Sequence, residues 1–120
     1  MRVLLVDDSD TMRRIQVNQL KQLGVQEIFQ ADNGKAGLET LEKNMPIDLV
    51  MLDQNMPIMD GLTCLKTIRA NDTYNNVRVI MCTSESEKEM VFEAIKAGAN
   101  DYIKKPFQGD ALKKKVIVGA

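Results

Sequence analysis

The chain has 120 residues, of which 44% are hydrophobic and 28% are charged. These values are typical of one globular domain, expected here over residues 1–120, and they exclude a disordered tail or a membrane span. The net charge of −1 excludes the strongly positive surface on which nucleic-acid binding depends. Histidine is absent, so any chemistry must come from carboxylates, lysine and hydroxyl groups.

The cysteines and the N-terminal residues indicate where the protein works. Cys64 and Cys82 lie in apolar surroundings without a C-x-x-C spacing, which predicts buried, reduced thiols. The apolar run after Met1 is interrupted by Asp7 and Asp8, so it is too short for the hydrophobic region of a signal peptide. We therefore expect a cytoplasmic protein that does not insert into membranes.

In chain order, short runs rich in Val, Ile and Leu alternate with helical patterns, which predicts parallel strands covered by helices on both faces. The strands are predicted over residues 3–6, 27–31, 49–52, 77–82 and 101–103. The apolar helix positions between and after them are Met12, Ile15, Leu20 and Leu23, then Leu38, Leu41 and Met45, then Leu62, Leu65 and Ile68, then Val91, Ala94 and Ile95, and finally Ala111, Leu112 and Val116.

Glycine, proline and capping signals predict where these helices begin and end. Gly24, Pro46 and Gly98 stand where the first, second and fourth helices should stop, and Ser86 with Glu89 forms a capping box at the start of the fourth. The fifth helix is expected from about Gln108. Five such units predict a (βα)5 doubly wound α/β domain, whose functional groups gather at the carboxyl ends of the strands.

Polar residues follow the central strands of this predicted sheet. Asp7 and Asp8 follow the first strand, Asp53 the third, Thr83 the fourth, and Lys105 comes soon after the fifth. Asp7 and Asp8 could cap a helix, and Thr83 could do the same. A carboxylate at the end of an apolar central strand, however, is rare unless it is paired or binds a metal, and Asp53 is such a residue.

Converging carboxylates need a cation, and Mg²⁺ prefers oxygen ligands and commonly binds a phosphoryl oxygen as well. An aspartate can attack phosphorus to form an acyl phosphate when a metal and a lysine neutralise the phosphoryl oxygens. Asp53 is the acid placed for that attack, which leaves Asp7 and Asp8 to hold the metal. A chain without histidine cannot itself carry a phosphohistidine, so such a donor would belong to a partner.

Four segments taken together resemble a response-regulator receiver domain, and the similarity covers essentially the whole chain. They are Val6-Asp7-Asp8, residues 51–61 (MLDQNMPIMDG), residues 82–85 (CTSE) and residues 102–107 (YIKKPF). Further similarity in residues 8–15 and 65–70 is greatest to the chemotaxis regulators of this family. The resemblance implies a flavodoxin-like fold with strand order 2-1-3-4-5, an order that periodicity does not determine.

The resemblance also implies how the chain works. Asp53 would accept a phosphoryl group from a sensor histidine kinase, with Mg²⁺ held by Asp7, Asp8, Asp53 and the backbone carbonyl of Asn55. Thr83 and Lys105 would contact the phosphoryl group, and the Lys105–Pro106 bond would be cis. Thr83 and Tyr102 would form the switch that changes the face made by the fourth helix, fifth strand and fifth helix.

Further implications concern partners and the lifetime of the signal. The partner on that face would be an output protein such as a flagellar motor switch component, and a phosphatase would be another partner. Asn55 and Glu85 match the chemotaxis type at positions that tune hydrolysis of the acyl phosphate, and Gln54 replaces an aromatic that is frequent there. The expected role is a phosphoacceptor switch and not an enzyme that acts on other substrates.

Four alternatives stay open at this point. A flavin-binding domain would share the fold, but the acidic residues 7–10 disfavour a phosphate site there. A phosphohydrolase of the haloacid-dehalogenase type also uses an aspartate and Mg²⁺, but Met12 departs from its motif. The chain could instead be a receiver from a larger regulator with a different output. An adaptor that works without phosphorylation is the fourth, although such an adaptor would lack one of the acids or the lysine.

Overall fold

The computed structural model describes residues 1–83, 88–105 and 109–117, and within these ranges five parallel strands alternate with five α-helices. The strands are β1 (Arg2–Val6), β2 (Glu27–Ala31), β3 (Leu49–Asp53), β4 (Arg78–Thr83) and β5 (Asp101–Lys104). The helices are α1 (Asp10–Gln22), α2 (Gly34–Lys43), α3 (Gly61–Arg69), α4 (Lys88–Lys96) and α5 (Gly109–Ile117), and a 3-10 helix, η1 (Asp72–Tyr74), precedes β4.

The sheet has the order β2-β1-β3-β4-β5, so β1, β3 and β4 are interior strands. Val6 pairs with Leu52, and Asp53 pairs with Cys82, in parallel register. Every strand of the sheet runs in the same direction, so Asp7, Asp53 and Thr83 come to one edge. Both the fold class and the strand order implied by the resemblance are confirmed.

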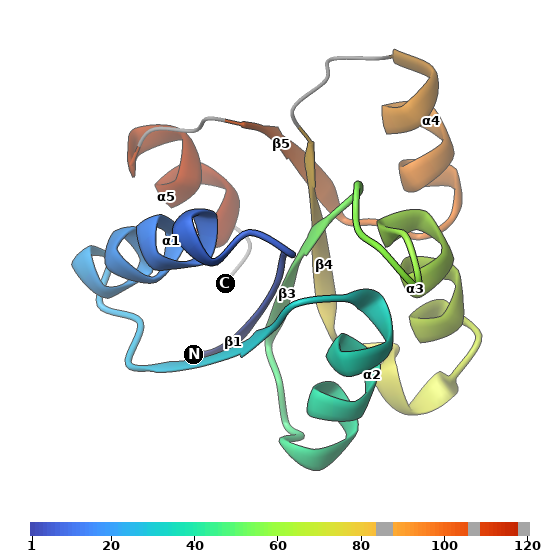
Figure 1. Ribbon diagram of the computed structural model, residues 1–120, viewed down its shortest axis with the longest axis horizontal. Coiled ribbons are helices and arrows are strands. Elements are labelled where there is room, and N and C mark those ends of the chain that lie inside the picture. The colour runs from blue at the N-terminus through green and yellow to red at the C-terminus, as the bar shows by residue number, and fades with distance from the viewer. Residues whose placement is uncertain (84–87, 106–108, 118–120) are drawn as a thin grey trace.

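Side chains alternate between the two faces of each strand, and this alternation builds two hydrophobic cores. Helices α2, α3 and α4 cover one face, and α1 and α5 cover the other (Figure 1). The first core includes Leu4, Val6, Leu41, Val50, Leu52, Leu65, Ile68 and Ala94. The second includes Val3, Leu5, Leu20, Leu49, Met51, Ile80, Cys82, Leu112 and Val116. The interior strands are buried on both faces, which explains their nearly continuous apolar sequence.

Three apolar helix positions of the sequence analysis are exposed in the structure: Ile15, Ile95 and Ala111. Ile15 of α1 is 45% exposed, and Gln16 beside it is buried at 2%. The inward positions of α1 are therefore Gln16 and Leu20, one helical turn apart, and Ile15 lies outside this stripe. In α4, Ala94 is buried but Ile95 is 47% exposed, because only a narrow face of this helix meets the sheet.

The ends of the helices largely follow the predicted signals. Gly24 and Gly98, with φ angles of 91° and 108°, stand just after α1 and α4 in the left-handed region that glycine tolerates. Helix α2 ends at Lys43 with Asn44 as its cap, so the prediction that Met45 belongs to this helix is wrong. Three of the predicted features cannot be compared with the structure. Ser86 and Gln108 lie outside the described residues, and so does Pro106 of the Lys105–Pro106 bond.

Candidate functional site

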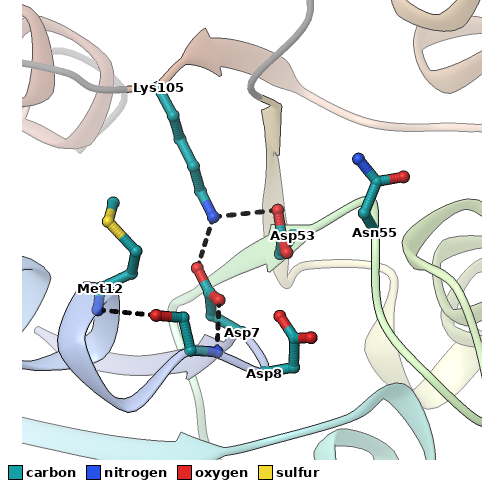
Figure 2. A pocket seen from close by; sticks show the side chains of 7 residues that line it. Asp7, Asp8, Met12, Asp53, Asn55 and Lys105 are labelled. Carbon is teal, nitrogen blue, oxygen red and sulfur yellow. Dashed lines mark hydrogen bonds and ion pairs between the residues drawn. The ribbon is translucent and has the colours of Figure 1, made fainter.

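A pocket of about 390 Å³ opens at the carboxyl ends of the strands. It is lined by Asp7, Asp8, Ser9, Met12, Asp53, Asn55 and Lys105, which come from the ends of β1, β3 and β5 and from the start of α1 (Figure 2). The structure thus brings together five residues that the sequence analysis assigned to one site: Asp7, Asp8, Asp53, Asn55 and Lys105. Residues far apart in the chain meet here because parallel strands end at the same edge.

Asp7 is 2% exposed, and both of its carboxylate oxygens have partners. The backbone N–H of Ser9 donates to Oδ1 at 2.9 Å, and Lys105 Nζ donates to Oδ2 at 2.5 Å. Ser9 in turn caps α1, because its hydroxyl accepts from the N–H of Met12 at 3.2 Å. Asp7 is therefore held between the first turn of α1 and the lysine that follows β5.

Lys105 links the two buried carboxylates of the pocket. Its Nζ lies 3.0 Å from Asp53 Oδ1 while it also contacts Asp7, and its side chain is 11% exposed (Figure 2). The N–H of Lys105 donates to the carbonyl of Thr83 at 2.7 Å, so the lysine is anchored to the end of β4. Burial lowers the pKa of Lys105, but its hydrogen bonds to Asp7 and Asp53 and their charges raise it above its ordinary value.

Asp53 ends the central strand β3 and is 7% exposed. Burial raises its pKa, Lys105 opposes that increase, and the charges of Asp7 and Asp8 add to it. The net direction is upward, so one lysine does not fully offset the desolvation and the neighbouring negative charges. A second cation at this carboxylate would be electrostatically favourable.

The three carboxylates are arranged as a metal site would require. Oxygen atoms of Asp7, Asp8 and Asp53 all lie within 4.8 Å of one another. Hard oxygen donors of this kind suit Mg²⁺ or Ca²⁺ and do not suit metals that prefer sulfur. Asp8 is exposed, whereas the other two are buried, so the cluster opens to solvent on one side.

Comparison with known proteins identifies the family. The family model of the response regulator receiver domain matches residues 3–117. The chain belongs to this family. The match favours the receiver interpretation over the flavin-binding and phosphohydrolase alternatives.

The relatives of this receiver domain include chemotaxis proteins. CheY1 of Helicobacter pylori is 42% identical over 118 residues, which cover 98% of this chain and 95% of the relative. CheY-3 of Vibrio cholerae is 44% identical over 116 residues, which cover 97% and 88% of the two chains. The solved CheX-CheY-BeF3-Mg²⁺ complex from Borrelia burgdorferi matches with a TM-score of 0.92 and 32% identity, covering 99% of this chain and 88% of that one. The receiver domain is thus homologous to CheY regulators and has their flavodoxin-like fold.

Two of the remaining predicted site residues, Thr83 and Tyr102, do not line the pocket. Thr83 is 5% exposed at the end of β4, and its carbonyl accepts a hydrogen bond from the N–H of Lys105. Tyr102 is 39% exposed on β5, where Lys115 Nζ lies 5.4 Å from the centre of its ring. Glu85 lies outside the described residues. Of the two predicted switch residues, Thr83 is therefore buried at the end of β4, and Tyr102 lies on the surface beside Lys115 of α5.

Gln54 does not line the pocket. It is 8% exposed, its side-chain oxygen accepts from the N–H of Leu62 at 2.9 Å, and its carbonyl accepts from Gly61 at 3.0 Å. The side chain therefore fastens the loop after Asp53 to the first turn of α3. Because it points toward that helix, it shapes the site through the loop and not by covering the carboxylate.

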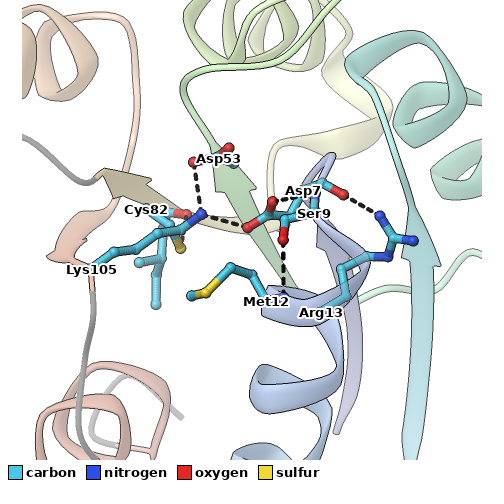
Figure 3. Close-up of polar contacts among 8 residues, drawn as sticks. Asp7, Ser9, Met12, Arg13, Asp53, Cys82 and Lys105 are labelled. Atoms are coloured by element: carbon cyan, nitrogen blue, oxygen red, sulfur yellow. Dashed lines mark hydrogen bonds and ion pairs between the residues drawn. The ribbon is translucent and has the colours of Figure 1, made fainter.

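Sequence reasoning missed two residues that support the pocket. Arg13 of α1 contacts the backbone carbonyl of Asp7 (Figure 3). A Cβ atom on Gly61 would lie 2.3 Å from the carbonyl oxygen of Asp53, so this position admits only glycine without displacement. The glycine was visible in the sequence, but its close approach to Asp53 depends on how α3 packs.

Among the described residues, no helix combines the length and the apolar character needed to cross a bilayer.

Proposed function

We propose that this receiver domain accepts a phosphoryl group on Asp53 from a sensor histidine kinase and thereby changes its affinity for an output partner. One observation carries the proposal: the buried Asp53 carboxylate shares Lys105 Nζ with Asp7 at the edge of an open, acidic pocket. A carboxylate oxygen of Asp53 would bond to phosphorus as the bond from phosphorus to the donor nitrogen breaks. Lys105 keeps its positive charge at neutral pH and can pair with a phosphoryl oxygen.

Mg²⁺ fits the acidic cluster. Three carboxylates face one lysine in the pocket, and the raised pKa of Asp53 reflects burial together with the charges of Asp7 and Asp8. We propose that Asp7, Asp8, Asp53 and the backbone carbonyl of Asn55 hold the ion. When bound, Mg²⁺ would neutralise charge on the phosphoryl oxygens. Lys105 supplies the other positive charge and orients the Asp53 oxygen that it contacts.

The signal would leave the pocket through Thr83 and Tyr102. Thr83 would contact a phosphoryl group on Asp53, and its carbonyl accepts a hydrogen bond from the backbone N–H of Lys105. Tyr102 is exposed enough to turn inward, which would change the surface of α4, β5 and α5. The CheY relatives support chemotaxis as the process, so a flagellar motor switch component is the proposed output partner.

A phosphatase is the third proposed partner, because the Borrelia burgdorferi structure holds CheY in a complex with CheX, BeF3 and Mg²⁺. Asn55 and Glu85 would tune the lifetime of the acyl phosphate. Residues 1–120 would act as one domain and as a switch, without activity on other substrates. Cytoplasmic location is also proposed, and the two free, buried cysteines are consistent with it.

Replacing Asp53 tests the proposal directly. Asp53→Asn keeps the shape of the side chain but removes the nucleophilic carboxylate, so acid-labile phosphate incorporation should fall to background. The measurement is Phos-tag electrophoresis after incubation with Mg²⁺ and either a phosphorylated histidine kinase or acetyl phosphate. Asp110→Asn, which removes an exposed acid at the start of α5, is the control and should be labelled like the wild type. Undiminished labelling of Asp53→Asn would assign the phosphate to another residue and overturn the proposal.

A further inference from the structure

Arg13 makes three polar contacts that join α1, the end of β1 and β2. Its Nε donates to Gln30 Oε1 at 3.3 Å, and its two terminal nitrogens contact the Asp7 carbonyl and the Asp10 carboxylate. The side chain is only 13% exposed. A salt bridge to Asp10 within one helical turn would explain one of these contacts but not the other two.

The contact between Arg13 and the Asp7 carbonyl constrains the backbone at Asp8. This carbonyl belongs to the peptide plane that also contains the N–H of Asp8, so holding the carbonyl fixes the direction in which the chain enters Asp8. The other side of the strand end is fixed by the Asp7 N–H, which donates to the Ala31 carbonyl at 3.1 Å. Both backbone polar groups of Asp7, its N–H and its carbonyl, are therefore hydrogen-bonded where the chain leaves β1 and enters Asp8.

Asp8 depends on this backbone support more than the other two acids of the cluster. Asp7 has a backbone N–H and Lys105 as partners, and Asp53 has Lys105. Within the part of the chain that the structure describes, the carboxylate of Asp8 makes no hydrogen bond or ion pair, and the residue is exposed. Its position in the cluster is thus set by the backbone to which it is attached.

We propose that Arg13 is a positioning residue for the cation site: it holds the Asp7–Asp8 peptide so that the Asp8 carboxylate faces Asp7 and Asp53. This inference rests on the proposed function, because it assumes that the acidic cluster binds Mg²⁺. Outer residues that orient metal ligands typically change metal affinity by about 10–100-fold when they are lost. A smaller effect is expected here, because Asp8 is exposed and water can replace part of its contribution.

The proposed role and a simple charge effect predict opposite results. Arg13 is a positive charge near a cation site, so its removal would strengthen Mg²⁺ binding if charge alone mattered. If Arg13 orients Asp8, its removal weakens Mg²⁺ binding despite the lost repulsion. Arg14 provides a matched control, because it is an exposed neighbour of the same charge on the same helix.

The test is an NMR titration of Mg²⁺ into the full chain, following the amide signals of residues 7–9. We expect the Mg²⁺ dissociation constant to rise about fivefold in Arg13→Ala and to stay within about twofold of the wild type in Arg14→Ala. Arg13→Lys keeps the stem and the charge but cannot span the three acceptors, so it should weaken binding about threefold. Thermal unfolding shows whether each variant is folded. If Arg13→Ala does not fold, the test is made on Arg13→Lys.

The outcomes separate this inference from the proposed function. Mg²⁺ binding to a folded Arg13→Ala variant that equals or exceeds wild-type binding would overturn the positioning role, as would wild-type binding by a folded Arg13→Lys variant. Failure of the wild-type protein to bind Mg²⁺ at all would instead overturn the metal-dependent function. The measurement needs no phosphoryl transfer, so it does not depend on finding the kinase.

Discussion

Lys105 shows how one side chain can hold two carboxylates of a pocket close together. Its ammonium group lies between two buried carboxylates that would otherwise repel each other. Unit charges about 4 Å apart interact by roughly 4 kcal/mol at an effective dielectric constant near 20, so removing the bridging cation would leave a costly pair. In the proposed function the same ammonium group would pair with a phosphoryl oxygen, because carboxylate and phosphoryl oxygens are both anionic hydrogen-bond acceptors.

Gly61 determines how closely α3 approaches the backbone of Asp53. A Cβ atom there would lie 2.3 Å from the Asp53 carbonyl oxygen and 2.9 Å from the Gln54 Cα, both of which are backbone atoms. We expect Gly61→Ala to lower the free energy of unfolding by about 2–3 kcal/mol, because the loop or the helix must move. Urea denaturation followed by circular dichroism measures this change.

Gly109 offers the matched control for this substitution. A Cβ atom added there would meet nothing within 4 Å, and the residue begins α5. Gly109→Ala should therefore be neutral or stabilise by up to about 1 kcal/mol. If Gly61→Ala proved as stable as the wild type, this would contradict the inference that α3 packs closely against the backbone of Asp53.

At the scale of elements, Arg69 joins the C-terminal end of α3 to three neighbouring segments. Its guanidinium donates to the carbonyls of Gly98, Tyr74 and Val77 and to Asn100 Oδ1, at 2.8 to 3.0 Å. Burial lowers the pKa of Arg69. The side chain thus fixes the loop between α4 and β5 against the segment before β4, at the end of α4 farther from the acidic pocket.

Arg69→Met retains the apolar stem but leaves these carbonyls without their donor. We expect the free energy of unfolding to fall by about 3 kcal/mol. Hydrogen bonds to charged groups contribute about 1.5–3 kcal/mol each, but Arg69 is only partly buried, so water can replace part of what the four lost bonds contribute. Lys66→Met, an exposed change of the same charge on α3, should stay within about 0.5 kcal/mol of the wild type. Urea unfolding of both variants provides the measurement, and equal stability of the two would contradict the role given to Arg69.

At the scale of the whole molecule, the two cores enclose one cysteine each. Cys64 lies in the first core and Cys82 in the second, directly opposite Asp53 in the β3–β4 pair. Burial raises the pKa of both thiols to about 12; the charge of Asp60 adds to this at Cys64, and at Cys82 the nearby charges act in both directions. Folding therefore favours the neutral form of both side chains.

This preference predicts that stability falls in alkaline solution. Above the ordinary thiol pKa of 9.0 the unfolded chain loses these protons while the folded chain keeps them until about pH 12, so the free energy of unfolding decreases between these values. The slope is about 1.4 kcal/mol per pH unit for each thiol. Urea unfolding at pH 8 and pH 10 should show a steeper loss in the wild type than in the Cys64→Ala/Cys82→Ala variant. Identical slopes would mean that the thiols are not sequestered.

Local signals in the sequence were sufficient for much of the fold. The alternation of apolar runs and helical patterns predicted the five strands to within about one residue at each end, because buried parallel strands have a distinct composition. Single side chains were less predictable: Ile15 was expected inside α1, where Gln16 is buried instead. Periodicity alone does not show which stripe of a helix meets the sheet.

The sequence by itself determined which polar residues end the strands, because strand ends and their acids are local features of the chain. Only the tertiary structure decided that Lys105 bridges Asp7 and Asp53, residues 98 and 52 positions away from it. It also decided that Arg13 holds the Asp7 carbonyl and that Gly61 touches Asp53. These contacts depend on strand order and on the packing of α1 and α3 against the sheet, which bring distant backbone and side-chain atoms to one edge.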